Sequence, residues 1–128
     1  MIILDTSIWI EYLKNNDPIF EQVDALLEQN EVLALSFIFG ELLQGSKNQR
    51  ERQVIHEFWN VLPKIDETGL FIRAGLESGK HRWMDKGIGL IDSTILIASV
   101  ESRSFVWTLD KKLSRSLSRE QRYIPAEY

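Results

Sequence analysis

MIILDTSIWI, residues 1–10, is the stretch of sequence that decides the fold. Its apolar residues Ile2, Ile3 and Leu4 form a short run that ends at Asp5. Short apolar runs bounded by polar turn formers are typical of buried parallel strands. In open α/β sheets, ligands bind just outside the carboxyl ends of such strands. Asp5 is therefore expected at a ligand-binding edge.

The rest of the chain alternates short apolar runs with longer amphipathic stretches. Further strands are expected at residues 31–35, 61–62, 105–109 and near 123–124. Helices are expected from a cap at Thr6 or Ser7 to residue 14, and at 18–29, at 37–45 after a cap at Ser36, and at 48–60, 67–84, 90–101 and 111–117. Strands that alternate with helices indicate crossover connections and a parallel sheet. We predict that residues 1–128 form one α/β domain around such a sheet.

Composition restricts the class of protein. Hydrophobic residues make up 44% and charged residues 27%, and no apolar run approaches the roughly 20 residues that cross a bilayer. The absence of cysteine excludes disulfides, zinc–thiolate sites and cysteine nucleophiles, and it fits a reducing cytosol. A formal charge of -4 argues against binding nucleic acid by overall charge, but it is compatible with a local basic patch. We expect a cytoplasmic protein with no membrane partner.

Three further acids are expected at the edge where Asp5 lies. Asp110 follows the strand at 105–109, and Glu41 and Asp92 lie near the starts of helices that leave the same edge. Such acids need protons or cations, because two charges about 4 Å apart repel by about 4 kcal/mol at an effective dielectric of 20. Oxygen ligands without His or Cys favour Mg²⁺ or Mn²⁺ over zinc. Five hydroxyl groups are candidates to orient the carboxylates or water: Thr6, Ser7, Ser93, Thr94 and Thr108.

Each acid also has a simpler interpretation. An Asp after a strand is often a turn former, and Asp110 can cap the next helix. Asp92, near the start of its helix, can interact favourably with the dipole of that helix. Glu41 is less easily explained in this way, because it lies within FIFGELL, residues 37–43, where a solvated charge is unexpected. The coincidence of four acids favours a metal site that activates water against a phosphodiester.

Four segments resemble the PIN-domain ribonucleases, specifically the VapC-type toxins of bacterial toxin–antitoxin systems. They follow one another along nearly the whole chain: LDTSIWIEYL, FGELLQG, KGIGLIDSTILIAS and VWTLDKKL. The resemblance implies a three-layer α/β/α sandwich with a central parallel sheet, and a Mg²⁺-dependent endoribonuclease that cuts structured RNA such as tRNA. It assigns Asp5, Glu41, Asp92 and Asp110 to the acidic catalytic and metal-binding positions. It also implies a homodimer and inhibition by a VapB-like antitoxin.

Lysines near the acids are candidates to guide an RNA backbone: Lys47, Lys86, Lys111 and Lys112. Two other functions stay open on the residues alone. A Mg²⁺-dependent phosphatase would use Asp5 as a covalent nucleophile, but its usual second Asp is replaced here by Ser7. A non-catalytic module that binds RNA or a partner protein would use the acids to hold a structural cation.

Overall fold

The central sheet places the opening stretch in the middle of the protein. The computed structural model describes residues 1–125, in which the parallel strands have the order β2-β1-β3. They are β1 (Ile2–Leu4), β2 (Val32–Leu33) and β3 (Phe105–Trp107). Ile3 is aligned with Leu33 on one side and with Val106 on the other. All of β1 is buried, as the apolar run predicts.

One margin of the sheet lies beyond β2, where Ala34 and Lys64 form a single parallel bridge. The strand predicted at residues 61–62 is wrong, because helix α4 (Gln49–Val61) continues into this segment. The helix ends there because Leu62 takes the extended conformation that a following proline favours.

The other margin lies beyond β3, where Val106 and Arg122 form a single parallel bridge. The backbone N–H of Tyr123 also donates to the carbonyl oxygen of Val106 at 2.9 Å. The strand predicted near residues 123–124 is therefore reduced to one bridge. Pro125 follows, and it has no N–H with which to continue a ladder.

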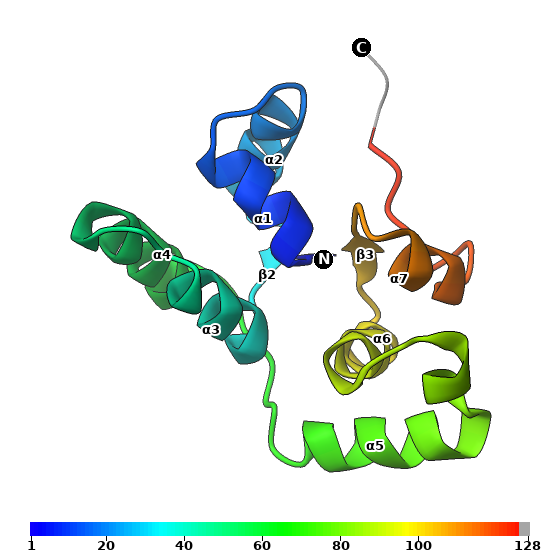
Figure 1. The fold of residues 1–128 in the computed structure, drawn as a ribbon. Coiled ribbons are helices and arrows are strands. Elements are labelled where there is room, and N and C mark those ends of the chain that lie inside the picture. Colours follow the sequence, from blue (N-terminus) through cyan, green and yellow to red (C-terminus); the bar gives the residue numbers. More distant parts are fainter. Residues whose placement is uncertain (126–128) are drawn as a thin grey trace.

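Helices cover both faces of the sheet (Figure 1). α1 (Thr6–Leu13) and α2 (Ile19–Glu28) lie on one side of the strands, and α5 (Leu70–His81) and α6 (Leu90–Ser102), which the 3₁₀ helix η1 (Trp83–Lys86) connects, lie on the opposite side (Figure 1). α3 (Ser36–Gln44) and α4 flank β2, and α7 (Lys111–Ser116) flanks β3 (Figure 1). The α/β/α sandwich with a central parallel sheet is thus confirmed. Within residues 1–125, no helix has the length and apolar character that crossing a membrane requires.

The helix predicted for residues 67–84 is divided in the structure. α5 begins after Gly69, whose φ is 71°, and it stops at Arg82, whose φ is 55°. Glycine takes a positive φ at low cost, and a left-handed residue after the last turn commonly ends a helix. Gly87, with a φ of 79°, makes the next turn, between η1 and α6.

A cluster of aromatic side chains fastens α1 to α3 and α4. Trp9 is 1% exposed, and its ring centroid lies 5.2 Å from that of Phe39, 5.5 Å from Phe58 and 5.9 Å from Tyr12. Each such aromatic pair adds about 0.5 to 1.5 kcal/mol to the gain from burial. Because α1 follows Asp5 and α3 carries Glu41, this cluster fixes the relative position of two of the predicted acids.

The cap expected at Ser36 is also wrong. Leu35 takes the N-cap position of α3, and Ser36 is the first helical residue. The backbone N–H of Ser36 and its hydroxyl donate to the carboxylate of Glu67, at 2.8 and 2.6 Å. A distant acid thus satisfies the free N–H at the start of this helix.

Arg122 fastens the end of α7 to the sheet. Its Nη2 donates to the carbonyl oxygens of Ser114 at 2.8 Å and Leu117 at 3.1 Å. The carbonyl groups at a helix end have no partner within the helix, and a cation there is favourable. This contact gives one polar residue of the C-terminal segment a structural role.

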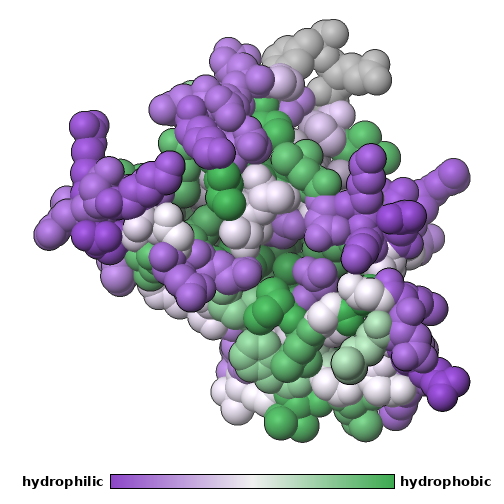
Figure 2. All heavy atoms as spheres, in the orientation of Figure 1, coloured by the Kyte–Doolittle hydropathy of each residue, from purple (hydrophilic) through white to green (hydrophobic). Residues whose placement is uncertain are grey.

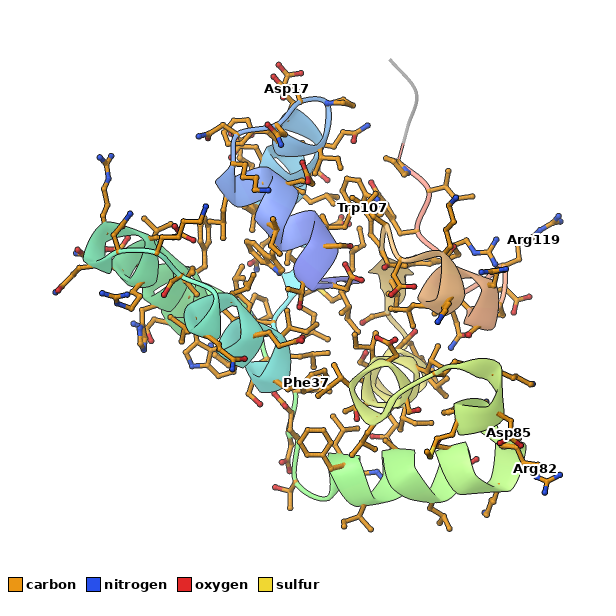
Figure 3. The ribbon with its side chains drawn as sticks, in the orientation of Figure 1. Asp17, Phe37, Arg82, Asp85, Trp107 and Arg119 are labelled. Atoms are coloured by element: carbon orange, nitrogen blue, oxygen red, sulfur yellow. The ribbon has the colours of Figure 1, made fainter. Side chains whose placement is uncertain are left out.

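We expect Arg122→Ala to lower the free energy of unfolding by about 1 to 3 kcal/mol, since hydrogen bonds from a charged group are removed. The loss is limited because Arg122 Nε is buried without a partner and this defect disappears with the side chain. Urea denaturation measures the total loss, and hydrogen exchange should locate faster opening in α7. Arg119→Ala is the matched control, because Figure 3 shows Arg119 pointing away from the protein. Equal stability of the two variants would contradict this role for Arg122.

Candidate active site

Asp5 lies at the carboxyl end of the central strand and is 6% exposed. Its carboxylate accepts hydrogen bonds from the hydroxyls of Ser7 and Thr108 and from the backbone N–H of Ile8 at 3.3 Å. Burial raises the pKa of Asp5 above its ordinary value, and these hydrogen bonds offset part of that effect. Asp5 is also the N-cap of α1, so the cap predicted at Thr6 or Ser7 is wrong.

Two hydroxyl groups connect Asp5 to the loop after β3. The oxygen of Thr108 accepts from the backbone N–H of Asp110 at 2.9 Å, and the oxygen of Ser7 accepts from that of Leu109 at 3.0 Å. Each hydroxyl therefore donates to Asp5 and accepts from the loop. The structure brings two of the predicted supporting residues, Ser7 and Thr108, to this carboxylate, where their hydrogen bonds fix its orientation.

Asp92 is the half-buried centre of the acidic group. It lies in the first turn of α6, so its carboxylate stands at the same edge as the end of β1. Burial raises the pKa of Asp92, and the charges of Asp110, Asp5 and Glu41 raise it further, in that order. The structure therefore brings the four predicted acids within electrostatic range of one another.

Asp110 and Glu41 form the exposed margin of this group. Asp110 caps α7, because its Oδ1 accepts from the backbone N–H groups of Lys112 at 2.8 Å and Leu113 at 3.2 Å. Glu41 Oε1 accepts from the Thr6 hydroxyl at 2.9 Å. The sequence predicted that Glu41 would not be solvated, but its side chain is exposed, so this prediction is wrong. The buried face of α3 is formed by Ile38, Phe39 and Leu42, and Glu41 lies at the margin of this face, where its carboxylate reaches solvent.

The donor set suits a hard divalent cation, although the acids do not converge on one point. In the part of the chain that the structure describes, no group of three or more His, Cys, Asp or Glu side chains is placed to hold one ion. Mg²⁺ usually keeps several of its waters and binds through one or two carboxylates. Asp92 and the three carboxylates around it, one of them on the exposed Glu41 side chain, are compatible with that mode of binding.

The predicted lysines lie on two sides of the acids. Lys47 lines a cavity of about 300 Å³ together with Thr6 and Glu41. Lys86 and Lys112 line another, of about 440 Å³. Lys111 is the exposed first residue of α7.

Arg115 lines the second cavity as well, and it is absent from the predicted set. The signal was present in the sequence, because residues three apart in the predicted helix 111–117 share a face, which places Arg115 beside Lys112.

The fold and the acidic edge together define the class of protein. The PIN domain family matches residues 2–116, a range that includes all four acids, and the chain belongs to this family. Ribonuclease VapC32 of Mycobacterium tuberculosis, matched in two strains, is 30% identical over 118 residues, which cover 88% of this chain and 87% of the relative. The resemblance to the VapC-type members is confirmed.

Proposed function

We propose that the protein is a metal-dependent endoribonuclease that hydrolyses phosphodiester bonds of structured RNA such as tRNA. The observation that carries this proposal is the environment of Asp92, whose ionisation is opposed by burial and by three other carboxylates. Among the described residues, no Lys or Arg side chain is one of the groups that shift its pKa. An acidic group of this kind at the carboxyl edge of a parallel sheet calls for a bound cation. Membership of the PIN family and the name of the relative support RNA as the substrate.

Mg²⁺ is the ion that we propose, with Mn²⁺ as the alternative, because all the donors are oxygen atoms. Asp5, Glu41, Asp92 and Asp110 would hold it, directly or through water. When bound, such an ion lowers the pKa of water and stabilises the charge on a departing oxygen.

The protein's own groups would prepare this site for the substrate. Ser7 and Thr108 hold the Asp5 carboxylate in one orientation, and the Thr6 hydroxyl donates to the Glu41 carboxylate. Positive side chains would draw the RNA backbone toward the acids: Lys47, Lys86, Lys111 and Lys112.

The alternative functions are less well supported. In a phosphatase that uses Asp5 as a nucleophile, one of its oxygens must attack phosphorus. Here both oxygens accept hydrogen bonds and the side chain is 6% exposed, which is unfavourable for attack. A non-catalytic module would bind RNA and metal without cutting, which the experiment below distinguishes.

The similarity to a VapC-type protein also supports a toxin role. We propose that a VapB-like antitoxin covers the acidic edge, and that the protein acts in the cytoplasm as a homodimer. Co-expression with the neighbouring open reading frame, followed by size-exclusion chromatography, would identify both partners.

The metal requirement is tested with the purified protein and bulk tRNA. We expect cleavage with Mg²⁺ or Mn²⁺ and none after EDTA. Addition of Mg²⁺ without RNA should also raise the melting temperature (Tm), since a ligand that binds only the folded state stabilises it. Cleavage that survives EDTA would contradict the metal requirement. Binding of tRNA with Mg²⁺ but no cutting would favour the non-catalytic module, and release of phosphate from small phosphoesters alone would favour the phosphatase.

A further inference from the structure

A basic cavity lies beside the acidic edge, between the turn after η1 and the helix α7. It has a volume of about 440 Å³ and is lined by Lys86, Ile88, Lys112, Arg115 and Ser116. Ile88, 3% exposed, forms its apolar floor, and three exposed cations surround it. Figure 2 shows hydrophilic side chains over α7, and Figure 3 shows nitrogen-bearing side chains projecting around it. Three positive charges thus gather in a chain whose formal charge is -4.

These cations lack acidic partners. The cavity has no Asp or Glu in its lining, and Lys86, Lys112 and Arg115 take part in no ion pair within residues 1–125. Arg115 Nε donates to the carbonyl oxygen of Lys111 at 3.1 Å. Its terminal guanidinium nitrogens have no hydrogen bond to the described part of the chain. The charge of this cavity is therefore left for an external anion.

The cavity is built from the two segments that carry Asp92 and Asp110. The backbone N–H of Lys112 donates to Asp110, and Ile88 lies just before the first turn of α6, where Asp92 stands. The Lys112 side chain crosses between the segments, since its Nζ lies 3.4 Å from the point that a Cβ on Gly87 would occupy. An anion in the cavity would therefore lie next to the acidic edge.

We propose that Lys86, Lys112 and Arg115 bind a phosphate of the substrate backbone beside the bond that is cut, an inference that rests on the proposed function. A polynucleotide presents phosphates at regular intervals, so holding one of them here places a neighbouring phosphate at the acids. Arginine offers a planar set of donors suited to phosphate oxygens, and the lysines add point charges. An acidic protein segment is the less favoured occupant, because nothing would then connect this cavity with the reaction next to it.

The test measures the affinity for bulk tRNA at several salt concentrations, in an Asp92→Asn background so that the RNA is not cut. The logarithm of the affinity falls linearly with the logarithm of the salt concentration, and each phosphate contact makes this slope steeper by about 0.7 to 0.9. Arg115→Gln should make the slope shallower by about that amount, and Lys112→Gln combined with Arg115→Gln should make it shallower by about twice as much. Arg115→Lys should restore most of the slope, because it restores the charge.

Arg52→Gln is the matched control, since it removes one exposed positive charge from α4, on the other side of the sheet (Figure 1). Its slope should equal that of the Asp92→Asn parent. An equal decrease for Arg52→Gln and Arg115→Gln would overturn the proposal, and so would weaker binding at an unchanged slope with a lower Tm, which indicates a structural role.

Two further probes identify other anions. If inorganic phosphate raises the Tm of the parent but not of Arg115→Gln, and the salt dependence of tRNA affinity is the same in both proteins, the cavity binds a free anion and the proposal is overturned. If polyglutamate binds the parent but not Arg115→Gln, and the salt dependence of tRNA affinity is again the same in both, the cavity binds an acidic protein segment and the proposal is also overturned.

The failure of the proposed function has a different signature. If the wild type cuts no RNA but Arg115→Gln reduces the salt dependence of tRNA affinity, the phosphate site is supported and the nuclease function is refuted. If the wild type cuts RNA but Arg115→Gln leaves the salt dependence unchanged, the nuclease function is supported and the phosphate site is refuted.

Discussion

Asp92→Asn is expected to reduce Mg²⁺-dependent cleavage of tRNA by about 1,000-fold or more. Asp92 is the acid on which the charges of the other three converge, so its loss removes a donor from the middle of the group. The asparagine side chain has the same shape but no charge, and it would hold a divalent cation poorly. Gel analysis of tRNA fragments over time measures the loss. The increase in Tm on adding Mg²⁺ should disappear as well.

Asp85→Asn is the matched control, because it makes the same chemical change in an exposed acid of η1. Asp85 lies 3.7 Å from Arg82 in a surface ion pair, which contributes little to stability. Cleavage by this variant should equal that of the wild type. Undiminished cleavage by Asp92→Asn would refute the assignment of the site.

Asp92→Asn should also be more stable than the wild type at neutral pH without metal, by an increase in Tm of the order of a few °C. The folded protein binds the Asp92 proton more tightly than the unfolded chain does, because the folded pKa is raised. Wild-type stability should therefore fall, relative to the variant, as the pH rises from the ordinary pKa of 3.8 toward the raised one. Below that interval both states are protonated and the difference should vanish. A less stable variant at neutral pH would mean that the helix-dipole interpretation of Asp92 dominates.

The central strand β1 and the order of the main strands and helices agree with the predictions from the sequence. β1 could be predicted because three consecutive apolar residues before a polar group fit a strand that is buried on both faces. The position of the acids followed from topology, since parallel strands end at the same edge. Asp5, Asp92 and Asp110 needed only the order of strands and helices, which is also why boundary errors of a few residues did not move them.

Two of the errors, the N-cap of α1 and the exposure of Glu41, occur where a distant contact chooses between equal local patterns. Asp5, Thr6 and Ser7 can each cap a helix, and the choice of Asp5 depends on a bond with Thr108, 103 residues away. FIFGELL is apolar at nearly every position, so its periodicity could not show which side of α3 faces solvent. The packing of Trp9 on Phe39 decides that side and leaves Glu41 exposed.

Trp9→Ala is expected to lower the free energy of unfolding by about 3 to 5 kcal/mol, the usual cost of truncating a buried aromatic side chain. The ring is 1% exposed and contacts aromatic residues of α1, α3 and α4: Tyr12, Phe39 and Phe58. The free energy of unfolding of a small domain is about 5 to 15 kcal/mol, so this loss is a large part of the stability. The midpoint of urea denaturation measures it, and the transition should shift without a change in slope.

Trp59→Ala is the control, because it removes the same side chain from a half-buried position on α4. Trp59 contacts Phe39 at 5.5 Å and lies under the Lys64 ammonium at 4.8 Å, so its loss should cost clearly less. Trp9→Phe keeps an aromatic ring in the cluster and should fold even if Trp9→Ala does not. Equal losses for Trp9→Ala and Trp59→Ala would contradict a central role for Trp9. Trp9 packs α1 against α3, and these two helices carry the hydrogen-bonded pair Thr6 and Glu41. Trp9→Phe should therefore also reduce the increase in Tm that Mg²⁺ produces.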